Sequence, residues 1–451
     1  MKLAVIGGGG VRSMFLAKSI ARRSQSLGIT ELSFMDNDGE KLLIFGAMAK
    51  KVSSLLAPDL RFTLTSDPAA CLDKADYVIT TIRPGGDSQR VKDERAALSR
   101  GILGQETTGA AGFSFAMRSV PALAEYCELI KKHAKAGARM FNFTNPAGLV
   151  SQALSDMGYG FSYGICDAPS GMLHQIASFY GVPPGDVSGE VYGLNHLSFF
   201  KSITLKGKEI MDDFINDPRA YKKTELHIFE PDLIRQIGCV PNEYLYYFFY
   251  PEKAVANILK ARKTRGELIE EVNREMIREL SSMDGEKDFD ACLKVFEKWY
   301  GIRNDSYMEG ETGRRREGSF KFDIFSPDDG GYAGVALKYI DTVRSGKRDS
   351  MILCVKNEGA IQGLADDDVV EVSCDISPEG HRPHKFGKVD PRRLEQIRRV
   401  KIYERLCAQA IIRQDRSLAI DGLMLHPLVN SYALAKELTD VYFEYNKAFL
   451  R

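Results

Sequence analysis

The sequence carries no excess of either charge, because 61 Lys and Arg residues balance 61 Asp and Glu residues. A chain without net charge generates no global field that would attract a nucleic acid or an anionic membrane. It has no hydrophobic run of membrane-spanning length, and Met1 leads directly into an expected strand, which leaves no room for a signal peptide. We therefore expect neither a nucleic acid nor a membrane as a partner.

The sequence also lacks a Cys-x-x-Cys pair, an internal repeat and a low-complexity segment. Its eight cysteines are scattered, a pattern typical of reduced and buried thiols, and we therefore predict a cytoplasmic protein. A hydrophobic content of 44% with 27% charged residues is that of a globular protein. At 451 residues the chain is too long for one ordinary core, which predicts two domains.

A glycine-rich turn follows the first apolar run of the chain. The opening letters MKLAVIGGGGVRS place an expected strand at residues 2–6, four glycines after it, and a helical pattern from residue 11. This order brings backbone N–H groups and a helix N-terminus to a pyrophosphate. Arg12 stands where the usual fingerprint has its third glycine, so a tight turn without a ligand is the alternative. The expected cofactor contacts are Gly7, Gly8, Gly9, Gly10, Val11 and Arg12.

Asp36 ends the second expected strand, residues 31–35, where a carboxylate would accept a hydrogen bond from a ribose hydroxyl. An acidic residue there favours a 2′-hydroxyl and hence NAD over NADP, although Lys41 lies close enough in the sequence to contact a phosphate. Arg83 directly follows a further expected strand and completes the predicted NAD contacts.

Strand and helix patterns alternate over the first third of the chain, which predicts an α/β fold with a doubly wound parallel sheet of the Rossmann type. The expected strands are 2–6, 31–35, 61–65, 77–82, 139–143 and 161–165, and the expected helices are 11–23, 41–56, 88–99 and 116–136. From residue 166 the order loosens into a mixed α+β pattern with helices at 171–180, 332–345 and 391–451 and strands at 189–192, 198–205, 351–355 and 369–373. We divide the chain into an NAD-binding domain (1–165) and a catalytic and oligomerisation domain (166–451).

The polar residues near strand ends are the candidates for chemistry, because ligands of such sheets bind beyond the carboxyl ends of the strands. Cys166 and Asp167 follow a short strand, and His196 lies in a later loop. A thiolate and an imidazole can share a divalent cation. The spacing alone is a poor metal motif, however, and a buried thiol and a structural loop histidine are the alternative.

The segment 242–250 is dense in aromatic residues and reads first as an amphipathic core helix. A tyrosine in it could act as a base only beside a cation or metal, because its ordinary pKa is about 10. Glu106 lies in the loop GQETTGAAG, for which helix capping is the alternative role. Arg90, Asn145 and Arg265 suit an anion or a sugar, although single arginines usually lie on the surface.

Taken together, these pieces resemble glycoside hydrolase family 4. The motifs occur in the order of that family: the glycine turn with Asp36, Gly104-Gln105-Glu106-Thr107, Thr144-Asn145-Pro146, Cys166-Asp167-Ala168-Pro169, Gly193-Leu194-Asn195-His196, Tyr244-Leu245-Tyr246-Tyr247, Gly330-Gly331-Tyr332 and Asn357-Glu358-Gly359-Ala360-Ile361. The resemblance spans nearly the whole chain and implies a glycosidase that depends on NAD and Mn²⁺. Many members of the family act on 6-phospho-glucosides.

The resemblance implies a redox-assisted elimination rather than the two-carboxylate scheme of most glycosidases. NAD takes a hydride from carbon 3 of the sugar, which acidifies the proton on carbon 2. A base then removes that proton, the aglycone leaves from carbon 1, water adds, and the hydride returns. The substrate implied is a phosphorylated disaccharide or an aryl 6-phospho-glycoside, and the assembly implied is a homodimer or a homotetramer.

The resemblance also implies roles for single residues. Cys166 and His196 match the metal ligands, Asp167 matches the proton donor to the leaving group, and Tyr244 matches the base. A cation beside Tyr244 would lower its pKa into a useful range. Glu106 matches a carboxylate that raises the basicity of this tyrosine. The substrate-binding positions are matched by Arg90, Asn145 and Arg265, of which Arg265 is offset by one residue.

Three functions stay open at this point. The pair Cys166-Asp167 resembles the branch that acts on α-linked 6-phospho-glucosides, whereas the opening GGGGVR resembles 6-phospho-β-glucosidases, which we favour. A net oxidoreductase resembling the lactate and malate dehydrogenases would explain the glycine turn but not Cys166, Asp167 and His196. An NAD-binding sensor without turnover is the third. The polar segment 301–330 is expected to be a solvated loop, with a flap over a site as the alternative.

Overall fold

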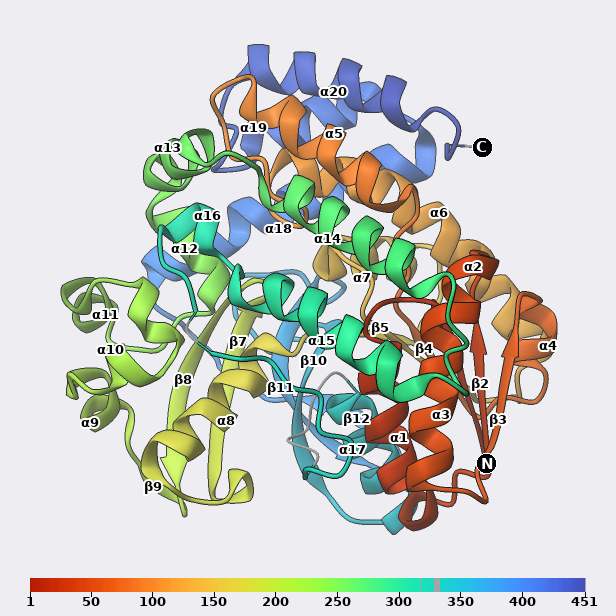
Figure 1. Cartoon of the computed structure of the whole chain (residues 1–451). Coiled ribbons are helices and arrows are strands. Elements are labelled where there is room, and N and C mark those ends of the chain that lie inside the picture. Colours follow the sequence, from red (N-terminus) through yellow and green to blue (C-terminus); the bar gives the residue numbers. More distant parts are fainter. Residues whose placement is uncertain (317, 328–332, 451) are drawn as a thin grey trace.

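The computed structural model describes residues 1–316, 318–327 and 333–450, and in this part of the chain one sheet of nine strands forms the centre of the fold (Figure 1). The strand order is β12-β11-β10-β6-β5-β4-β1-β2-β3. Strands β1 to β6 are parallel, whereas β10, β11 and β12 are antiparallel to their neighbours. Their bounds are β1 (Lys2–Ile6), β2 (Glu31–Met35), β3 (Arg61–Thr65), β4 (Tyr77–Thr80), β5 (Arg139–Asn142), β6 (Ser162–Gly164), β10 (Asp349–Lys356), β11 (Val369–Ser377) and β12 (Gly380–Pro383).

Helices pack on both faces of the parallel strands, which confirms the predicted doubly wound sheet of the Rossmann type (Figure 1). The expected helix at 41–56 is a continuous helical stretch that has a π-helical turn, Leu42–Gly46, near its start. The helices beside this half of the sheet are α1 (Ser13–Leu27), α2 (Gly39–Lys41), α3 (Ala47–Leu56), α4 (Pro68–Leu72), α5 (Gly86–Leu98), α6 (Ala110–His133) and α7 (Ala147–Asp156).

β1 lies between β2 and β4 and is buried along its whole length. Leu3, Val5 and Ile6 have no exposed surface. A parallel strand covered on both faces needs apolar residues at every position, not at alternate ones. For this reason β1 stands out in the sequence; β1, β2 and the partly exposed edge strand β3 have the predicted bounds.

A second, three-stranded antiparallel sheet packs against β11 and begins shortly after β6. Its strands are β7 (Val187–Leu194), β8 (Leu197–Leu205) and β9 (Lys208–Glu209). The backbone N–H of Val191 in β7 donates to the hydroxyl of Ser373 in β11 at 2.9 Å, so the two sheets share a polar contact inside the core.

Helices of the second half surround both sheets (Figure 1). They are α8 (Ala168–Tyr180), α9 (Met211–Asn216), α10 (Ala220–Lys223), α11 (Pro231–Ile237), α12 (Tyr246–Phe249), α13 (Pro251–Lys260), α14 (Arg265–Leu280), α15 (Phe289–Asp305), α16 (Glu309–Thr312), α17 (Gly334–Ser345), α18 (Pro391–Arg413), α19 (Arg416–Leu425) and α20 (Tyr432–Asn446), with 3₁₀ turns at Pro184–Asp186, Glu225–Ile228 and Glu243–Leu245. The segment 301–330, predicted to be a loop, therefore contains the end of α15 and all of α16. The motif Gly330-Gly331-Tyr332 and the predicted start of α17 at residue 332 lie outside the described residues.

The division of the chain at residues 165 and 166 stays a prediction. Strands β10, β11 and β12 come from the second part of the chain but extend the sheet of the first part, through the pairing of Cys354 in β10 with Gly164 in β6. One sheet thus joins elements far apart in the sequence, and the site at its edge draws on both parts.

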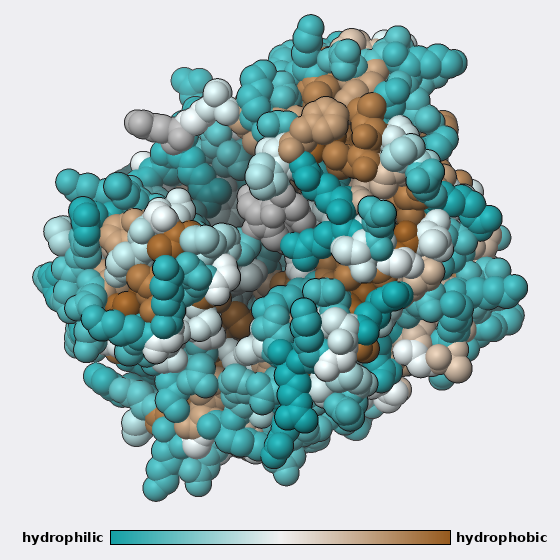
Figure 2. Space-filling model, turned by 90° about the horizontal axis from the view of Figure 1, so that it is seen from below, coloured by the Kyte–Doolittle hydropathy of each residue, from teal (hydrophilic) through white to brown (hydrophobic). Residues whose placement is uncertain are grey.

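The face shown in Figure 2 is largely hydrophilic, with hydrophobic residues in separate patches. The most exposed large hydrophobic side chains among the described residues belong to Leu43 (74%), Phe325 (66%) and Tyr432 (61%), which come from distant parts of the sequence. Within the described residues, we find no helix that is both long enough and apolar enough to cross a membrane.

A buried polar network fixes the C-terminal helix to the first half of the chain. Arg118 of α6 is 1% exposed and pairs with Asp93 of α5 at 2.6 Å. The same guanidinium donates to the side-chain oxygen of Asn446 in α20 at 2.6 Å and to the backbone oxygen of Pro84 at 3.0 Å. Because Pro84 follows Arg83 at the end of β4, α20 is connected to a loop at the edge of the sheet.

We expect Arg118→Met to lower the free energy of unfolding by about 3–5 kcal/mol, because it leaves the carboxylate of Asp93 buried without its cation. The matched control is Lys436→Met on α20, which removes an exposed pair with Asp440 and should cost less than about 1 kcal/mol. Urea unfolding followed by circular dichroism measures both changes. Equal effects of the two substitutions would show that the buried pair does not anchor α20.

Candidate functional site

Loops from four neighbouring parallel strands meet at one edge of the large sheet. The glycine turn follows β1, Arg83 follows β4, Asn145 follows β5 and Cys166 follows β6. Because β6, β5, β4 and β1 are adjacent and parallel, their carboxyl ends lie side by side. The strand order thus gathers these predicted site residues at one edge.

The glycine turn fits tightly against β2. The backbone N–H groups of Gly7 and Gly8 both donate to the carbonyl of Met35 at 2.8 Å. A Cβ on Gly8 would lie 2.5 Å from the Cβ of Phe34, and one on Gly7, whose φ is +96°, would lie 2.3 Å from the Thr81 carbonyl. Only glycine satisfies both the space and the backbone angle here. The turn is fixed by packing before any ligand arrives.

This turn fits the pyrophosphate and ribose of NAD. Among the described residues, no backbone hydrogen bond uses the N–H of Val11, which lies just before α1, so it can bind an anion at the N-terminus of a 15-residue helix. Asp36 lies at the end of β2, and its carboxylate accepts from the N–H of Gly9 at 2.9 Å. Each carboxylate oxygen has a second lone pair, so Asp36 can still accept from a ribose hydroxyl.

Arg12, in the place of the third glycine, lies at the N-terminus of α1 and 4.0 Å from the carboxylate of Asp167. The cofactor turn and the corner formed by Cys166 and Asp167 therefore adjoin. Sequence spacing gave no sign of this contact, because it joins residues more than 150 positions apart.

Glu106 is held between two arginines. Its Oε2 lies 2.6 Å from Nη1 of Arg83 and 3.0 Å from Nη1 of Arg90, and Arg90 also pairs with Glu94 at 2.7 Å. Burial acts to raise the pKa of Glu106, but the two arginines hold it well below its usual range. Glu106 is therefore a fixed anion within the group, not a proton donor.

A second pair of arginines lies beside this cluster. Arg265 donates to the hydroxyl of Ser306 at 2.6 Å and to the backbone oxygen of Arg303 at 2.8 Å. Burial lowers the pKa of Arg265, and the charge of Arg90 lowers it further. Burial also lowers the pKa of Arg303, to about 10, together with the charges of Arg12 and Arg265. Within the described residues Arg303 forms no ion pair with a carboxylate. Arg83 and Arg90 are paired with carboxylates, whereas Arg265 and Arg303 form no ion pair among the described residues, which favours binding of a phosphate by these two arginines.

Arg303 is a candidate that the sequence did not reveal. It stands in the segment predicted to be a solvated loop, whereas α15 continues through it to Asp305. In the sequence, the helical pattern that continues past Trp299 was the signal that could have placed Arg303 on a helix.

His196 and Tyr244 lie face to face, with ring centroids 3.7 Å apart and an angle of 3° between the ring planes. His196 occupies the tight turn between β7 and β8 with a φ of +64°. Burial lowers its pKa to about 3, so the imidazole is neutral at physiological pH and has a free lone pair. Burial, followed by the charge of Glu243, raises the pKa of Tyr244.

The surroundings of Cys166 are acidic. Its sulfur accepts from the N–H of Ala168 at 3.5 Å. Burial raises the pKa of the thiol well above its usual value, and the charges of Glu371, Asp167 and Glu243 raise it further. A cation here would relieve the mutual repulsion of these groups and would favour the thiolate.

The donor set fits a divalent transition metal with open coordination positions. A thiolate from Cys166 and a neutral imidazole from His196 are suitable ligands for such an ion. Among the described residues, no three His, Cys, Asp or Glu side chains are arranged to hold a metal on their own. A metal at Cys166 and His196 would therefore take its remaining ligands from water or substrate.

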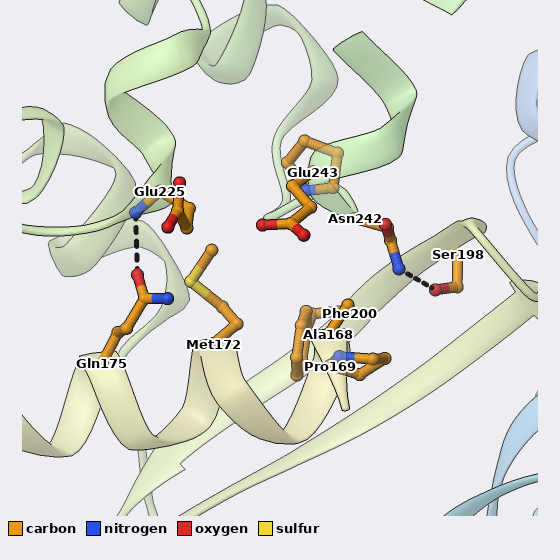
Figure 3. A pocket seen from close by; sticks show the side chains of 10 residues that line it. Ala168, Pro169, Met172, Gln175, Ser198, Phe200, Glu225, Asn242 and Glu243 are labelled. Atoms are coloured by element: carbon orange, nitrogen blue, oxygen red, sulfur yellow. Dashed lines mark hydrogen bonds between the residues drawn. The ribbon is translucent and has the colours of Figure 1, made fainter. Parts of the chain in front are cut away.

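A small cavity lies behind this corner, between α8, β8 and the turn that carries Tyr244 (Figure 3). The volume open to a water-sized sphere is about 10 Å³, which is room for one water. Glu225 and Glu243 face it above Met172. Glu243 accepts a hydrogen bond from the hydroxyl of Tyr307 at 2.5 Å. Burial, followed by the negative charge of Glu225, raises the pKa of Glu243 to about 7, although the hydrogen bond from Tyr307 and the positive charge of Arg316 act to lower it.

The aromatic segment 242–250 differs from its prediction. The single helix predicted at 242–250 is instead a 3₁₀ turn followed by the short α12, because the side chain of Asn242 accepts from the N–H of Tyr244 at 3.0 Å and starts a new turn.

Asn145 precedes Pro146 through a cis peptide bond, and its backbone oxygen accepts from Ser119 at 3.1 Å. The described contacts connect Asn145 with Ser119 of α6 and Ala147 of α7 rather than with the arginine cluster.

The chain matches known proteins over its full length. Residues 2–182 match the family model "Family 4 glycosyl hydrolase", and residues 191–429 match "Family 4 glycosyl hydrolase C-terminal domain". A 6-phospho-beta-glucosidase of Thermotoga maritima is 30% identical and covers 100% of both chains. A phospho-alpha-glucosidase of Clostridium acetobutylicum is 24% identical, over 99% of this chain and 98% of its own.

One solved structure of a Thermotoga maritima 6-phospho-beta-glucosidase, which contains manganese, NAD⁺ and glucose 6-phosphate, resembles this fold with a TM-score of 0.82 at 28% identity. The alignment covers 100% of this chain and 99% of the other.

We expect the stability of the metal-free protein to fall as the pH rises through 7, partly because of Glu243. Its pKa of about 7 in the fold exceeds the usual value of about 4.3, so the fold is favoured below pH 4 and loses on the order of 3 kcal/mol above pH 7. Glu243→Gln should flatten this dependence. Thermal melts between pH 5 and 8.5 with EDTA measure it, and the exposed Glu252→Gln is the control. Parallel pH profiles for wild type and Glu243→Gln would contradict the assignment.

Proposed function

Because the chain belongs to family 4 of the glycosyl hydrolases, we propose that it is a 6-phospho-glucosidase that prefers β-linked substrates and uses NAD⁺ and a divalent metal such as Mn²⁺. One observation carries the proposal: the ring of Tyr244 is stacked on His196, between acidic surroundings at Cys166 and a cluster of arginines around Glu106. Such a site can accept a cation on one side and a phosphate on the other.

The arginine cluster supports a phosphorylated sugar as the substrate. Arg265 and Arg303 lie beside Arg90 and supply fixed donors in a partly buried place, where an anion is bound more strongly than at an open surface. We assign the 6-phosphate to Arg265 and Arg303, and sugar hydroxyls to Arg90 and Asn145.

The glycine turn, from Gly7 to Arg12, together with Asp36 and Arg83, would hold NAD⁺, and Cys166 and His196 would hold the metal. When bound, NAD⁺ supplies a hydride acceptor for carbon 3 of the sugar, and the metal supplies a Lewis acid beside it. The ionised Glu106 fixes Arg83 and Arg90, so the guanidinium groups keep their orientation while ligands enter.

Two side chains of the protein move protons in this scheme. Tyr244 accepts the proton from carbon 2 of the oxidised sugar. The charge of Glu106 raises the pKa of Tyr244 and so makes its phenolate a stronger base. Asp167, exposed at the N-terminus of α8, donates a proton to the glycosidic oxygen as the aglycone leaves.

The α-linked 6-phospho-glucosides are the second candidate substrates, because the pair Cys166-Asp167 resembles the α branch. The higher identity to the β-glucosidase, 30% against 24%, and the GGGGVR opening support the β-linked series. A kinetic comparison of α- and β-linked aryl 6-phospho-glucosides decides between them. A net dehydrogenase would leave the stacked Tyr244 and His196 without a role.

We also propose a cytoplasmic, homo-oligomeric enzyme with an NAD-binding part before residue 166 and a catalytic part after it. All eight cysteines are free thiols, which suits a reducing compartment. Scattered exposed hydrophobic residues such as Tyr432 suit contacts with further copies. Light scattering coupled to size-exclusion chromatography measures the assembly.

We expect hydrolysis of an aryl 6-phospho-β-glucoside to require both NAD⁺ and Mn²⁺ and to fall at least about 100-fold when either is removed, because each supplies chemistry that no side chain here provides. The assay follows release of the aglycone after dialysis against EDTA and removal of NAD⁺, with each added back alone. NADH should not accumulate. Full activity without both cofactors, or stoichiometric NADH formed with a hydroxy acid, would refute the proposal.

We expect Tyr244→Phe to lower kcat by about 100-fold or more, since it removes the base but keeps the ring on His196. In D₂O the wild type should place deuterium at carbon 2 of the product, which mass spectrometry detects. Tyr250→Phe, on the same segment but half-buried away from His196, is the matched control. Deuterium at carbon 2 made at the wild-type rate by Tyr244→Phe would rule out this tyrosine as the base.

A further inference from the structure

One buried carboxylate connects the two turns that carry His196 and Tyr244. Glu371 lies in the middle of β11 and is 1% exposed. Its Oε2 accepts from the hydroxyl of Ser198 at 2.7 Å, and its Oε1 accepts from the side-chain amide of Asn195 at 3.1 Å. Asn195 and Ser198 lie on either side of His196, so Glu371 holds both arms of that turn.

The same network continues into the turn of Tyr244. The side-chain amide of Asn242 donates to the hydroxyl of Ser198 at 3.3 Å, a contact visible in Figure 3. The backbone N–H of Asn242 donates to the carbonyl of Ser198 at 2.9 Å. The side-chain oxygen of Asn242 then accepts from the N–H of Tyr244. A continuous chain of hydrogen bonds therefore runs from Glu371 through Ser198 and Asn242 to Tyr244.

This connection accounts for the parallel rings of His196 and Tyr244. The two residues come from separate turns, and a separation of 3.7 Å between ring centroids needs both turns to be fixed relative to each other. β11 is paired on both sides, with β10 and β12, and is packed against β7, so it is a rigid base for that purpose. Backbone hydrogen bonds already join β8 to the segment before Tyr244, and Glu371 adds a side-chain connection that reaches both arms of the His196 turn and, through Ser198, Asn242.

The charge of Glu371 is not compensated by the chain. Within the described residues Glu371 forms no ion pair, and its hydrogen-bond donors, Ser198 and Asn195, are neutral. Burial raises the pKa of Glu371 to about 7 against these two hydrogen bonds, so a cation nearby would favour its ionised form. The buried Lys401 pairs with Glu404 instead. A buried carboxylate without a cation is costly. Glu371 also acts electrostatically on Cys166, so a cation held by Cys166 would be attracted by this carboxylate.

We propose that Glu371 is a positioning residue that fixes His196 and Tyr244 relative to each other and that its negative charge strengthens binding of the divalent metal at Cys166 and His196. The proposal rests on the proposed function for the identity of the metal site and of the base. It adds a residue from the second half of the chain that contacts neither metal nor substrate. Groups that orient metal ligands in this way typically change metal affinity 10- to 100-fold.

Two variants separate the two effects. Glu371→Gln keeps the shape but removes the charge, and we expect the dissociation constant for Mn²⁺ to rise at least about tenfold. Ser198→Ala keeps the charge and the backbone hydrogen bond to Asn242 but removes the hydroxyl that connects Glu371 with the Asn242 side chain. We expect kcat to fall about tenfold or more, with KM and Mn²⁺ affinity within about threefold of wild type. Asp375→Asn, an exposed carboxylate on the same strand, is the control and should change neither value.

Mn²⁺ binding is measured from the electron paramagnetic resonance signal of free Mn²⁺, with NAD⁺ present, and NAD⁺ affinity is measured in parallel. A selective role requires unchanged NAD⁺ affinity in every variant. Mn²⁺ affinity equal in Glu371→Gln and Asp375→Asn would overturn the charge effect, and wild-type kcat in Ser198→Ala would overturn the positioning effect. If Glu371→Gln fails to fold, Glu371→Asp, which keeps the charge, should restore folding and Mn²⁺ binding; failure of Glu371→Asp to bind Mn²⁺ would overturn the proposal.

The outcome also separates this inference from the proposed function. If wild type hydrolyses no 6-phospho-glycoside but Glu371→Gln still weakens Mn²⁺ binding, the proposed function fails and the role of Glu371 in metal binding stands. If wild type hydrolyses the substrate and Glu371→Gln binds Mn²⁺ normally, the function stands and this inference fails.

Discussion

Parallel pairing of β1 with β2 and β4 is the constraint on which the rest of the structure depends. It directs the chain to leave each of these strands at the same edge, so the glycine turn, Arg83 and Asp36 are neighbours although up to 76 residues separate them. The glycine turn is held against β2, because two of its N–H groups donate to the carbonyl of Met35 and Gly8 lies tightly against Phe34. These contacts fix the course of the backbone after β1. The C-terminal strands then attach to the far side of β6 and bring the second half of the chain to that edge.

At this edge the protein separates charge over a short range while remaining neutral as a whole. Arginines gather around Glu106, and carboxylates gather around Cys166, with the stacked rings of His196 and Tyr244 near both. Each group of like charges is unfavourable alone, because like charges repel more strongly where water is excluded. A ligand of opposite charge at either group would relieve this repulsion and would be bound more strongly as a result.

The sequence allows part of this to be predicted and explains why the rest is hidden. A buried parallel strand needs continuous apolar residues, so β1 could be located with its observed bounds, whereas the edge strand β3 was located from its β-branched pattern. Motif order indicated Cys166, His196 and Tyr244 as candidate site residues. Arg303 was hidden because a helix continues through a polar segment. Glu371 could not be predicted because its partners lie more than 170 residues away, although an acid between Val370 and Val372, in an otherwise apolar run, was a usable signal. Long-range pairing, such as that of β10 with β6, has no local signature.

The contact between Arg12 and Asp167 has a consequence for the order of events at the site. At 4.0 Å and with both side chains well exposed, this pair contributes about 1 kcal/mol or less. A phosphate that settles on the glycine turn competes for Arg12 and exchanges one weak ion pair for a stronger one. In the proposed function, Asp167 would then be free to face a glycosidic oxygen. Binding of the cofactor at Arg12 would thereby be coupled to the availability of the proposed proton donor.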